Sequence, residues 1–197
     1  MPRRNFTGRR RSRSGVKLRF GYTLPSRCDE RWQGIGVVVV GINGRVSRMN
    51  WIFKKFADLS TEEIYGIIKL RIEVFIIEQN CIYQDCDGRD QAALHLFVQA
   101  DDRIVAYLRI LPKGSFYEEI CIGRLVVQKD YRGQGLAREL MLKEISFIES
   151  DLRENEIKIQ AQVYLTEFYK SLGFVQVSEE YLEDNLPHID MLKNSSL

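Results

Sequence analysis

A glycine-bearing turn between a predicted strand and a predicted helix carries the clearest chemistry in this sequence. Leu125-Val126-Val127 ends an apolar stretch, and Arg132-Gly133-Gln134-Gly135-Leu136-Ala137 follows it. The first backbone N–H groups of a helix have no intrahelical partner and lie at the positive end of its dipole, so such a turn suits a diphosphate. Gly133 and Gly135 lack a Cβ that would hold phosphates away, and Arg132 adds positive charge. On the turn alone, an ordinary loop leading into a core helix remains the alternative.

The turn resembles a family signature, and a second stretch downstream resembles the same family. Arg132-x-x-Gly135-x-Ala137 is similar to the Q/R-x-x-G-x-G/A signature of the GNAT acyltransferases, and Phe168-Tyr169-x-x-x-Gly173-Phe174 resembles their second characteristic stretch. Five segments resemble the ElaA-type branch of this superfamily: EVFIIEQNCIYQDCDGRD (73–90), AYLRIL (106–111), IGRLVV (122–127), AQVYLTEFYKSLGF (161–174) and HIDM (188–191). The resemblance spans residues 49–197 and leaves 1–48 unmatched.

This resemblance implies a fold and a cosubstrate. The fold is α/β (α+β), the GNAT acyl-CoA N-acyltransferase fold, in which a mixed twisted sheet with splayed central strands is flanked by helices. Acetyl-CoA is the implied cosubstrate, with its pantetheine arm between the strands at 120–127 and 157–163. The residues that match backbone contacts to this arm are Leu125, Val126 and Val127. Those that match the diphosphate turn are Arg132, Gly133, Gln134, Gly135, Leu136 and Ala137, where Ala137 replaces a glycine found in many members.

Transfer of an acyl group from a thioester to an amine sets three chemical requirements. The ammonium must lose a proton, a donor must polarise the carbonyl, and the leaving thiolate, with a pKa of about 8.5, must gain a proton. Tyr169 matches the tyrosine that supplies this proton in many GNAT enzymes, and Tyr164 is a weaker competitor. A packing role with a hydrogen-bonded hydroxyl is the alternative for Tyr169. The Val127 amide is the candidate donor to the carbonyl.

The sequence leaves the general base open. The candidates are carboxylates that suit a surface or loop-bracing role equally well: Glu78, Asp87, Glu118 and Glu119. His95 and His188 are candidates for the acceptor pocket or for action through water, because histidine titrates near neutrality. The alternative for each histidine is a hydrogen-bonded structural role.

Two arginines lie inside predicted strands. An unpaired buried charge is costly, so Arg109 and Arg124 are each predicted to face a carboxylate or the acceptor site. The predicted substrate pocket consists of Glu78, Arg109, His95 and His188. Cys81 and Cys121 would allow a covalent acyl intermediate, but nothing in the sequence places a histidine beside either thiol. Direct attack of the amine is therefore favoured.

These features favour an acetyl-CoA-dependent N-acetyltransferase that acts on a small-molecule or peptide amine. A CoA-binding sensor or interaction module without transferase activity is the alternative. Nucleic-acid binding is restricted to an arginine-rich arm at 1–48, and it would weaken steeply with salt. GNAT relatives frequently pair, which leaves a homodimer open, but the sequence does not fix the oligomeric state. The acceptor depends on loops such as 79–91, whose shape the sequence does not reveal.

Periodicity and turn residues predict the elements that position these groups. Ser60-x-x-Glu63 is a capping box that begins a helix, and a helical stretch continues or restarts through 74–76. A second helix follows the glycine turn, and a short one at 166–172 ends at Gly173. Strands are predicted at 51–56, 93–99, 104–111, 120–127, 157–163, 174–177 and 188–192. This order predicts a mixed α/β arrangement around one sheet.

Composition narrows the class of protein. The chain has 197 residues, 45% hydrophobic and 28% charged, which suits one globular domain. The purely apolar runs, such as the one at 37–40, are far shorter than the roughly 20 residues of a membrane helix. The cysteines show no CxxC spacing and the histidines number two, so no metal site is predicted. Reduced thiols in the cytoplasm are favoured for Cys28, Cys81, Cys86 and Cys121.

Charge divides the chain into two segments. Residues 1–48 hold 12 Lys and Arg against two acidic residues, a net charge of +10, so residues 49–197 carry −8. The first segment is predicted to be a disordered basic extension, because it shows no sustained period. Three explanations compete: a nucleic-acid arm, a targeting segment, or a stretch upstream of a true start at Met49, which is favoured. Residues 49–197 form the predicted acyltransferase domain.

Overall fold

The computed structural model describes residues 36–40 and 46–195. The strands in these ranges are β1 (Gly36–Val40), β2 (Val46–Lys55), β3 (Leu94–Ala100), β4 (Arg103–Leu111), β5 (Ile120–Val127), β6 (Glu156–Gln162), β7 (Val175–Gln176), β8 (Tyr181–Glu183) and β9 (Leu186–Asn194). The α-helices are α2 (Thr61–Arg71), α3 (Leu136–Phe147) and α4 (Thr166–Lys170). Two π-helical turns extend α2 and α3: Ile72–Glu78 and Ile148–Leu152.

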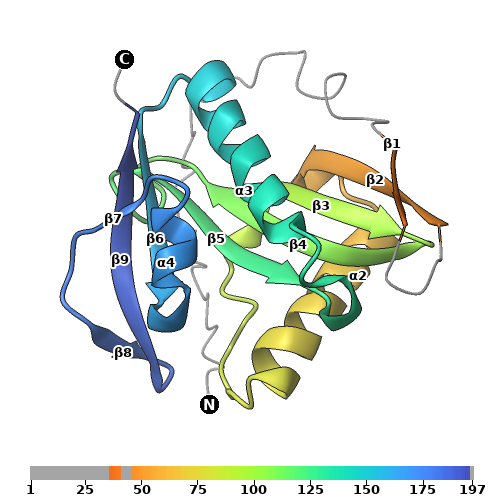
Figure 1. Cartoon of the computed structure of the whole chain (residues 1–197), viewed down its shortest axis with the longest axis horizontal. Coiled ribbons are helices and arrows are strands. Elements are labelled where there is room, and N and C mark those ends of the chain that lie inside the picture. Colours follow the sequence, from red (N-terminus) through yellow and green to blue (C-terminus); the bar gives the residue numbers. More distant parts are fainter. Residues whose placement is uncertain (1–35, 41–45, 196–197) are drawn as a thin grey trace, which may run out of the picture.

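The strands form one mixed sheet, in the order β1-β2-β3-β4-β5-β6-β9-β7, with β8 paired to β9 (Figure 1). Neighbours on this path are antiparallel, except that β5 and β6 are parallel. A parallel pair needs a crossover connection, and α3 supplies it between β5 and β6. The predicted α/β architecture is confirmed.

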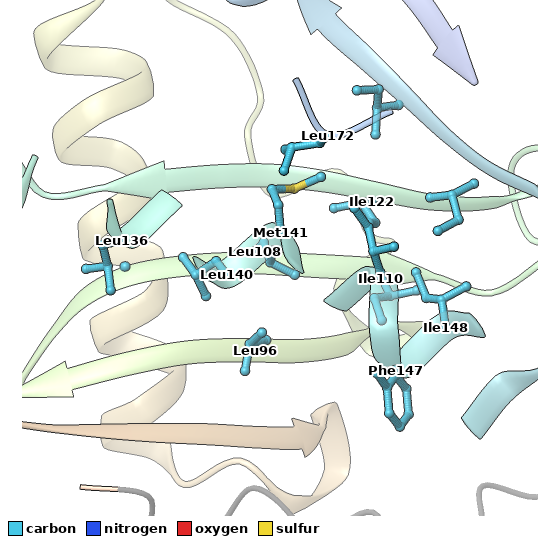
Figure 2. Close-up of a cluster of buried hydrophobic side chains, with 14 of the residues drawn as sticks. Leu96, Leu108, Ile110, Ile122, Leu136, Leu140, Met141, Phe147, Ile148 and Leu172 are labelled. Atoms are coloured by element: carbon cyan, nitrogen blue, oxygen red, sulfur yellow. The ribbon is translucent and has the colours of Figure 1, made fainter. Parts of the chain in front are cut away.

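Alternation along the strands explains how the two long helices cover opposite faces. Leu96 and Leu108 belong to the core cluster that includes the buried residues of α3 (Figure 2). Phe97 follows Leu96 and Tyr107 precedes Leu108 in the chain. Both belong instead to the cluster around Ile67 of α2. Because successive side chains of a strand point to opposite faces, α3 and α2 cover different sides of the sheet. None of the helices in the described ranges is long and apolar enough to cross a membrane.

The predicted capping box begins α2 as expected. The Glu63 amide donates to Ser60 Oγ at 3.2 Å, and the Ser60 amide donates to the Glu63 carboxylate at 2.8 Å. The helix does not stop at Arg71, because the π-helical turn Ile72–Glu78 continues it toward the centre of the sheet. This confirms the predicted helical stretch through 74–76.

The structure differs from the sequence prediction around the N-terminal segment. Gly36–Val40, predicted to lack regular structure, forms β1 and pairs with β2, because its run of β-branched valines favours an extended conformation. Strand β2 begins at Val46, so Met49 lies inside it. The rest of the segment, with Cys28, lies outside the described residues, and the domain boundary at Met49 stays a prediction.

One helix carries a buried acid that its apolar pattern does not predict. Glu144 of α3 is 1% exposed, and its Oε1 has no hydrogen-bond partner within the described ranges. Burial raises its pKa well above the ordinary value for glutamate, because burial disfavours the ionised carboxylate in the folded protein.

Replacing Glu144 with methionine is expected to stabilise the protein at alkaline pH. A folded-state pKa above the unfolded value stabilises the fold at low pH, and this contribution is lost as the pH rises from the unfolded value toward the folded one. The free energy of unfolding of Glu144→Met is expected to exceed that of the wild type by about 1–3 kcal/mol at pH 8, measured by urea denaturation. Glu139→Met, on the exposed side of α3, is the control. An unchanged pH dependence in Glu144→Met would contradict the assignment.

Candidate active site

A cleft opens where two parallel strands part. Strands β5 and β6 pair at just two positions, Ile120 with Ile157 and Cys121 with Lys158. Beyond them lies a cleft of about 380 Å³, lined on one side by Gly123 to Val127 and on the other by residues of β6 such as Gln160. The expected splay of the central strands is present. An edge of β5 without a strand partner leaves backbone groups available to a bound molecule.

A β-bulge interrupts β5 beside this cleft. Arg109 pairs with Gly123 and Tyr107 pairs with Val126, so two residues of β5 oppose the single residue between them on β4. Arg124, one of the two, has a φ of 55°, in the left-handed region that arginine rarely adopts.

The bulge determines where the Val127 amide points. The Gln128 amide donates to Val105 O at 2.8 Å, so Gln128 faces β4. Antiparallel residues alternate in this respect, so Val127, paired with Ala106, turns its N–H and C=O toward the cleft. Its carbonyl accepts from Arg132 Nε at 2.9 Å, as this orientation requires. The amide proposed from the sequence to polarise a carbonyl is therefore on the cleft side.

The glycine turn leads from β5 into α3 with room for a ligand. Gly133 and Gly135 have φ values of 74° and 81°, and a Cβ built on either would meet no atom within 4 Å. Gly135 is the N-cap of α3, with no side chain capping the helix. Among the described residues, no loop carbonyl accepts a hydrogen bond from the amides at 133–137. These N–H groups at the helix N-terminus suit an anion.

Two residues predicted for different parts of the site contact each other. Arg132 donates to both carboxylate oxygens of Glu78, at 2.5 and 2.9 Å. These hydrogen bonds lower the pKa of Glu78 below its ordinary value. Arg132 thus joins the glycine turn to the end of the α2 extension, and Glu78 is an ionised partner of this arginine.

Tyr169 of α4 lies in the wall of the cleft. It is 7% exposed, and its ring makes edge contacts with Phe168 and Phe174 at centroid distances of 5.1 and 6.0 Å. Burial, with a smaller effect of Tyr164, raises the pKa of Tyr169 well above that of free tyrosine. The phenol therefore stays protonated at neutral pH and is available as a donor. Tyr164, 73% exposed, is open to solvent.

His188 of β9 lines the same cleft. Its Nδ1 lies 2.8 Å from Leu186 O, and its ring stacks on Tyr181 with centroids 6.2 Å apart. A carbonyl oxygen accepts but does not donate, so the proton of the neutral ring belongs on Nδ1. The other nitrogen, Nε2, keeps a lone pair that can accept a proton.

The structure places His95 outside the cleft, in the arrangement expected of the structural alternative. This residue is 1% exposed, with Nδ1 2.9 Å from the Tyr107 hydroxyl and Nε2 3.0 Å from Asp90 O, and it does not line the cleft. Burial lowers its pKa, so it is a neutral structural residue. Strand alternation places it beneath the loop at 79–91.

Arg109 lines the cleft, but its charge is already compensated. It donates to Asp90 at 2.6 Å and to both carboxylate oxygens of Asp87. Arg109 therefore faces carboxylates, one of the two predicted outcomes.

The structure also disfavours three of the carboxylates that the sequence offered as the general base. Although burial acts to raise it, hydrogen bonds from Arg109 hold the pKa of Asp87 well below its usual range. Glu118 and Glu119, in the connection between β4 and β5, do not line the cleft. Burial raises the pKa of Cys121 to about 12, which makes this thiol a poor nucleophile.

A buried ionic cluster holds the loop at 79–91 against the sheet, and most of it is not predicted. Its centre is Asp85, 5% exposed. Asp85 Oδ2 accepts from Arg71 Nε and Oδ1 accepts from Arg124 Nε, both at 2.8 Å, and Arg71 also donates to Asp90 at 2.8 Å. The available signal was Arg71 on the apolar side of a helix, which requires a buried acid nearby.

The same loop reaches the far wall of the cleft. The side-chain amides of Gln79 and Gln162 lie 3.3 Å apart, joining the end of the α2 extension to the end of β6. Cys81 Sγ donates to Asp184 O, in the turn between β8 and β9, at 3.2 Å. The loop therefore forms one wall of the cleft. Within the described ranges, no group of three His, Cys, Asp or Glu side chains is placed to hold a metal ion.

Comparisons with known proteins agree with this geometry. The family model described as "Acetyltransferase (GNAT) domain" matches residues 56–195. The chain belongs to this family, and it is an acyltransferase.

The relatives point to one branch of the family. Protein ElaA of Escherichia coli is 36% identical over 147 residues, which cover 74% of this chain and 96% of that protein. The crystal structure of ElaA covers 74% of this chain and 99% of its own, with a TM-score of 0.70. An acyl-CoA N-acyltransferase from Pseudomonas aeruginosa, 39% identical with a TM-score of 0.71, covers the same shares. The chain is therefore of the ElaA type.

Gly135→Glu is expected to abolish binding of acetyl-CoA. The carboxylate would place negative charge and bulk at the helix N-terminus, and affinity should fall by about a hundredfold or more, measured by isothermal titration calorimetry. Gly114→Glu is the matched control, because Gly114 also has a positive φ (71°) and open surroundings. Equal affinity of the two variants would show that the turn does not hold the diphosphate.

Proposed function

We propose that this protein transfers an acetyl group from acetyl-CoA to an amine by direct attack. The observation that carries the proposal is a cleft lined by Val127 and the buried phenol of Tyr169, with Arg132 joining this lining to the uncapped N-terminus of α3. These are the three kinds of donor that a CoA thioester requires: for its diphosphate, its carbonyl and its sulfur.

In this proposal, the two parts of acetyl-CoA use different backbone donors. The amides of Gln134 to Ala137 hold the diphosphate, with Gly133 and Gly135 giving it access to the backbone. The pantetheine arm lies between β5 and β6, where Leu125 to Val127 offer an unpaired strand edge. Backbone donors of this kind recognise an extended amide-containing chain as a neighbouring strand would.

The reaction then needs two proton transfers. The amine nitrogen attacks the thioester carbonyl, a C–N bond forms, the C–S bond breaks, and the Val127 amide stabilises the developing oxyanion. The amine proton passes to Nε2 of His188, which keeps a lone pair. Tyr169 gives its proton to the departing sulfur and regains one from solvent.

The acceptor end of the cleft fits a small-molecule or peptide amine that carries positive charge. Glu183 and Asp184, at the turn between β8 and β9, add carboxylates to the cleft lining, beside the ring of Tyr117. The arginines in the lining, Arg89, Arg109, Arg124 and Arg132, are each paired with a carboxylate, and Lys158 already contacts the Tyr117 ring. The carboxylates of Glu183 and Asp184 are therefore the groups that would favour a cationic acceptor at this end.

The experiment that tests this proposal is a thiol-release assay on the full chain with acetyl-CoA and a panel of primary amines. Release of CoA that depends on the amine is the expected result, and His188→Asn is expected to slow it. Tight binding of acetyl-CoA and CoA without thiol release from any amine would contradict transfer and would indicate the CoA-binding module instead. Failure to bind acetyl-CoA at millimolar concentration would contradict both.

Tyr169→Phe is expected to reduce kcat by about a hundredfold, with KM for acetyl-CoA nearly unchanged. The substitution removes the proton donor and keeps the ring that packs between Phe168 and Phe174. Steady-state kinetics of the thiol-release reaction measure the effect, with Tyr65→Phe on the exposed side of α2 as control. A full rate across the pH range would show that Tyr169 is not the acid.

A further inference from the structure

The bulge in β5 changes which side of the sheet its residues face. Ile120 and Ile122 pack in the core beneath α3, as alternation requires, and Cys121 lies on the other face. After the bulge, Leu125 and Val127 pack toward the α3 core and Val126 packs beneath α2. The inserted residue therefore shifts the alternation by one position.

A regular ladder would give β5 a different arrangement. Continuing the pairing of Leu111 with Cys121 and Ile110 with Ile122 would bring Val127 opposite Val105. Val127 would then donate its amide to Val105 O, the carbonyl that Gln128 uses in this structure. The Val127 N–H would face β4, and the cleft would lose its donor to the thioester carbonyl.

Arg124 has an unfavourable backbone conformation at this bulge. Its φ of 55° is unfavourable for a residue with a Cβ, and glycine would adopt this conformation without that cost. In the regular ladder, strand alternation would point the Arg124 side chain into the apolar core beneath α3. The bulge directs it instead to the face where the loop at 79–91 lies.

An ion pair on that face compensates for the strained backbone. Arg124 Nε lies 2.8 Å from Asp85 Oδ1, and its Nη2 lies 3.4 Å from Asp87 Oδ2. Asp85 is held from two further sides, by Arg71 Nε at 2.8 Å and by the Tyr83 hydroxyl at 2.9 Å. The Asp85 carboxylate therefore has partners that hold it in place independently of Arg124. This carboxylate is buried, where solvent screens an ion pair least.

We propose that Arg124 and Asp85 lock the register of β5, and that this lock turns the Val127 amide into the cleft. Arg124 and Asp85 are then positioning residues: they act through the backbone of Val127 and not by binding the acyl group. The link to acyl transfer rests on the function proposed above, whereas the conformation of β5 can be measured without any ligand.

The test compares alanine with glycine at position 124 in the full chain. Arg124→Gly loses the ion pair but accepts a positive φ, so it should retain the bulge, with kcat and acetyl-CoA affinity within about threefold of the wild type. Arg124→Ala loses the ion pair and keeps the strain, so kcat should fall by about tenfold or more. Asp85→Asn should reduce kcat in the wild-type background and have a smaller effect in the Arg124→Gly background, as a double-mutant cycle measures.

Amide hydrogen exchange of the β5 peptide provides the readout that is independent of catalysis. The exchange rate of the Val127 amide should fall in Arg124→Ala, because the regular ladder hydrogen-bonds this amide to Val105 O. In Arg124→Gly the rate should remain as in the wild type. Arg153 provides matched controls, because it also has a positive φ (56°) but lies at the end of the turn that extends α3. Arg153→Ala and Arg153→Gly should change the melting temperature without altering exchange in β5 or turnover.

Two results would overturn the lock. Equal losses in Arg124→Gly and Arg124→Ala would mean that the charge of Arg124 itself serves the reaction, and unchanged exchange of Val127 in both would mean that the bulge does not need the ion pair. If the wild type released no CoA while Arg124→Ala still altered exchange of Val127, the proposed function would fail and the lock would stand.

Discussion

The early separation of β5 from β6 is the constraint on which the site depends. A sheet normally satisfies the backbone groups of its inner strands, and here an inner strand has partners along one edge for most of its length. That edge would be costly to bury without a substitute for the missing strand. The glycine turn follows β5 directly, and α4 and the loop at 79–91 contribute to the lining of the cleft beside this edge.

The ionic cluster explains how a loop without regular structure can form a wall of that gap. Buried charges stabilise a fold little once their desolvation is counted, but removing one partner is strongly unfavourable. Because Asp85, Asp87 and Asp90 are each held by arginines from α2, β4 or β5, the loop has few alternative positions. The ionic cluster therefore determines the position of the loop more than it stabilises the fold. Although burial acts to raise the pKa values of Asp87 and Asp90, the neighbouring arginines lower both, which makes these two carboxylates poor bases.

Local signals in the sequence predicted the parts of the fold that local physics determines. The capping box at Ser60 and Glu63 and the bounds of β5 at Ile120 and Val127 follow from residue type and spacing. Strand β8 is not among the predicted strands. It is joined to β9 by a two-residue turn, Asp184-Asn185, with positive φ at both residues (50° and 64°). Such a turn is typical of a tight hairpin, and its Asp-Asn pair was the available signal.

Residue spacing along the chain does not reveal which distant side chains contact each other in the site. A charged residue within a strand predicted a carboxylate for Arg109 and Arg124, but not that both would find it in the loop at 79–91. For His95, a histidine in a strand looks the same in sequence whether it faces a cleft or a buried tyrosine, so both roles stayed open. Gly123, inside the predicted strand and directly before Arg124, was the available signal for a bulge, but it does not reveal the φ of Arg124 or the shifted alternation of Leu125 to Val127.

The cleft between β5 and β6 is lined from both faces of the sheet. Its lining includes Met141 from α3 on one face and Val74 from the α2 extension on the other. Side chains from two separate cores therefore meet at this point, and a substitution in either core can change the shape of the cleft. In the proposed reaction, this would let residues on both faces of the sheet influence how the two reactants are held together.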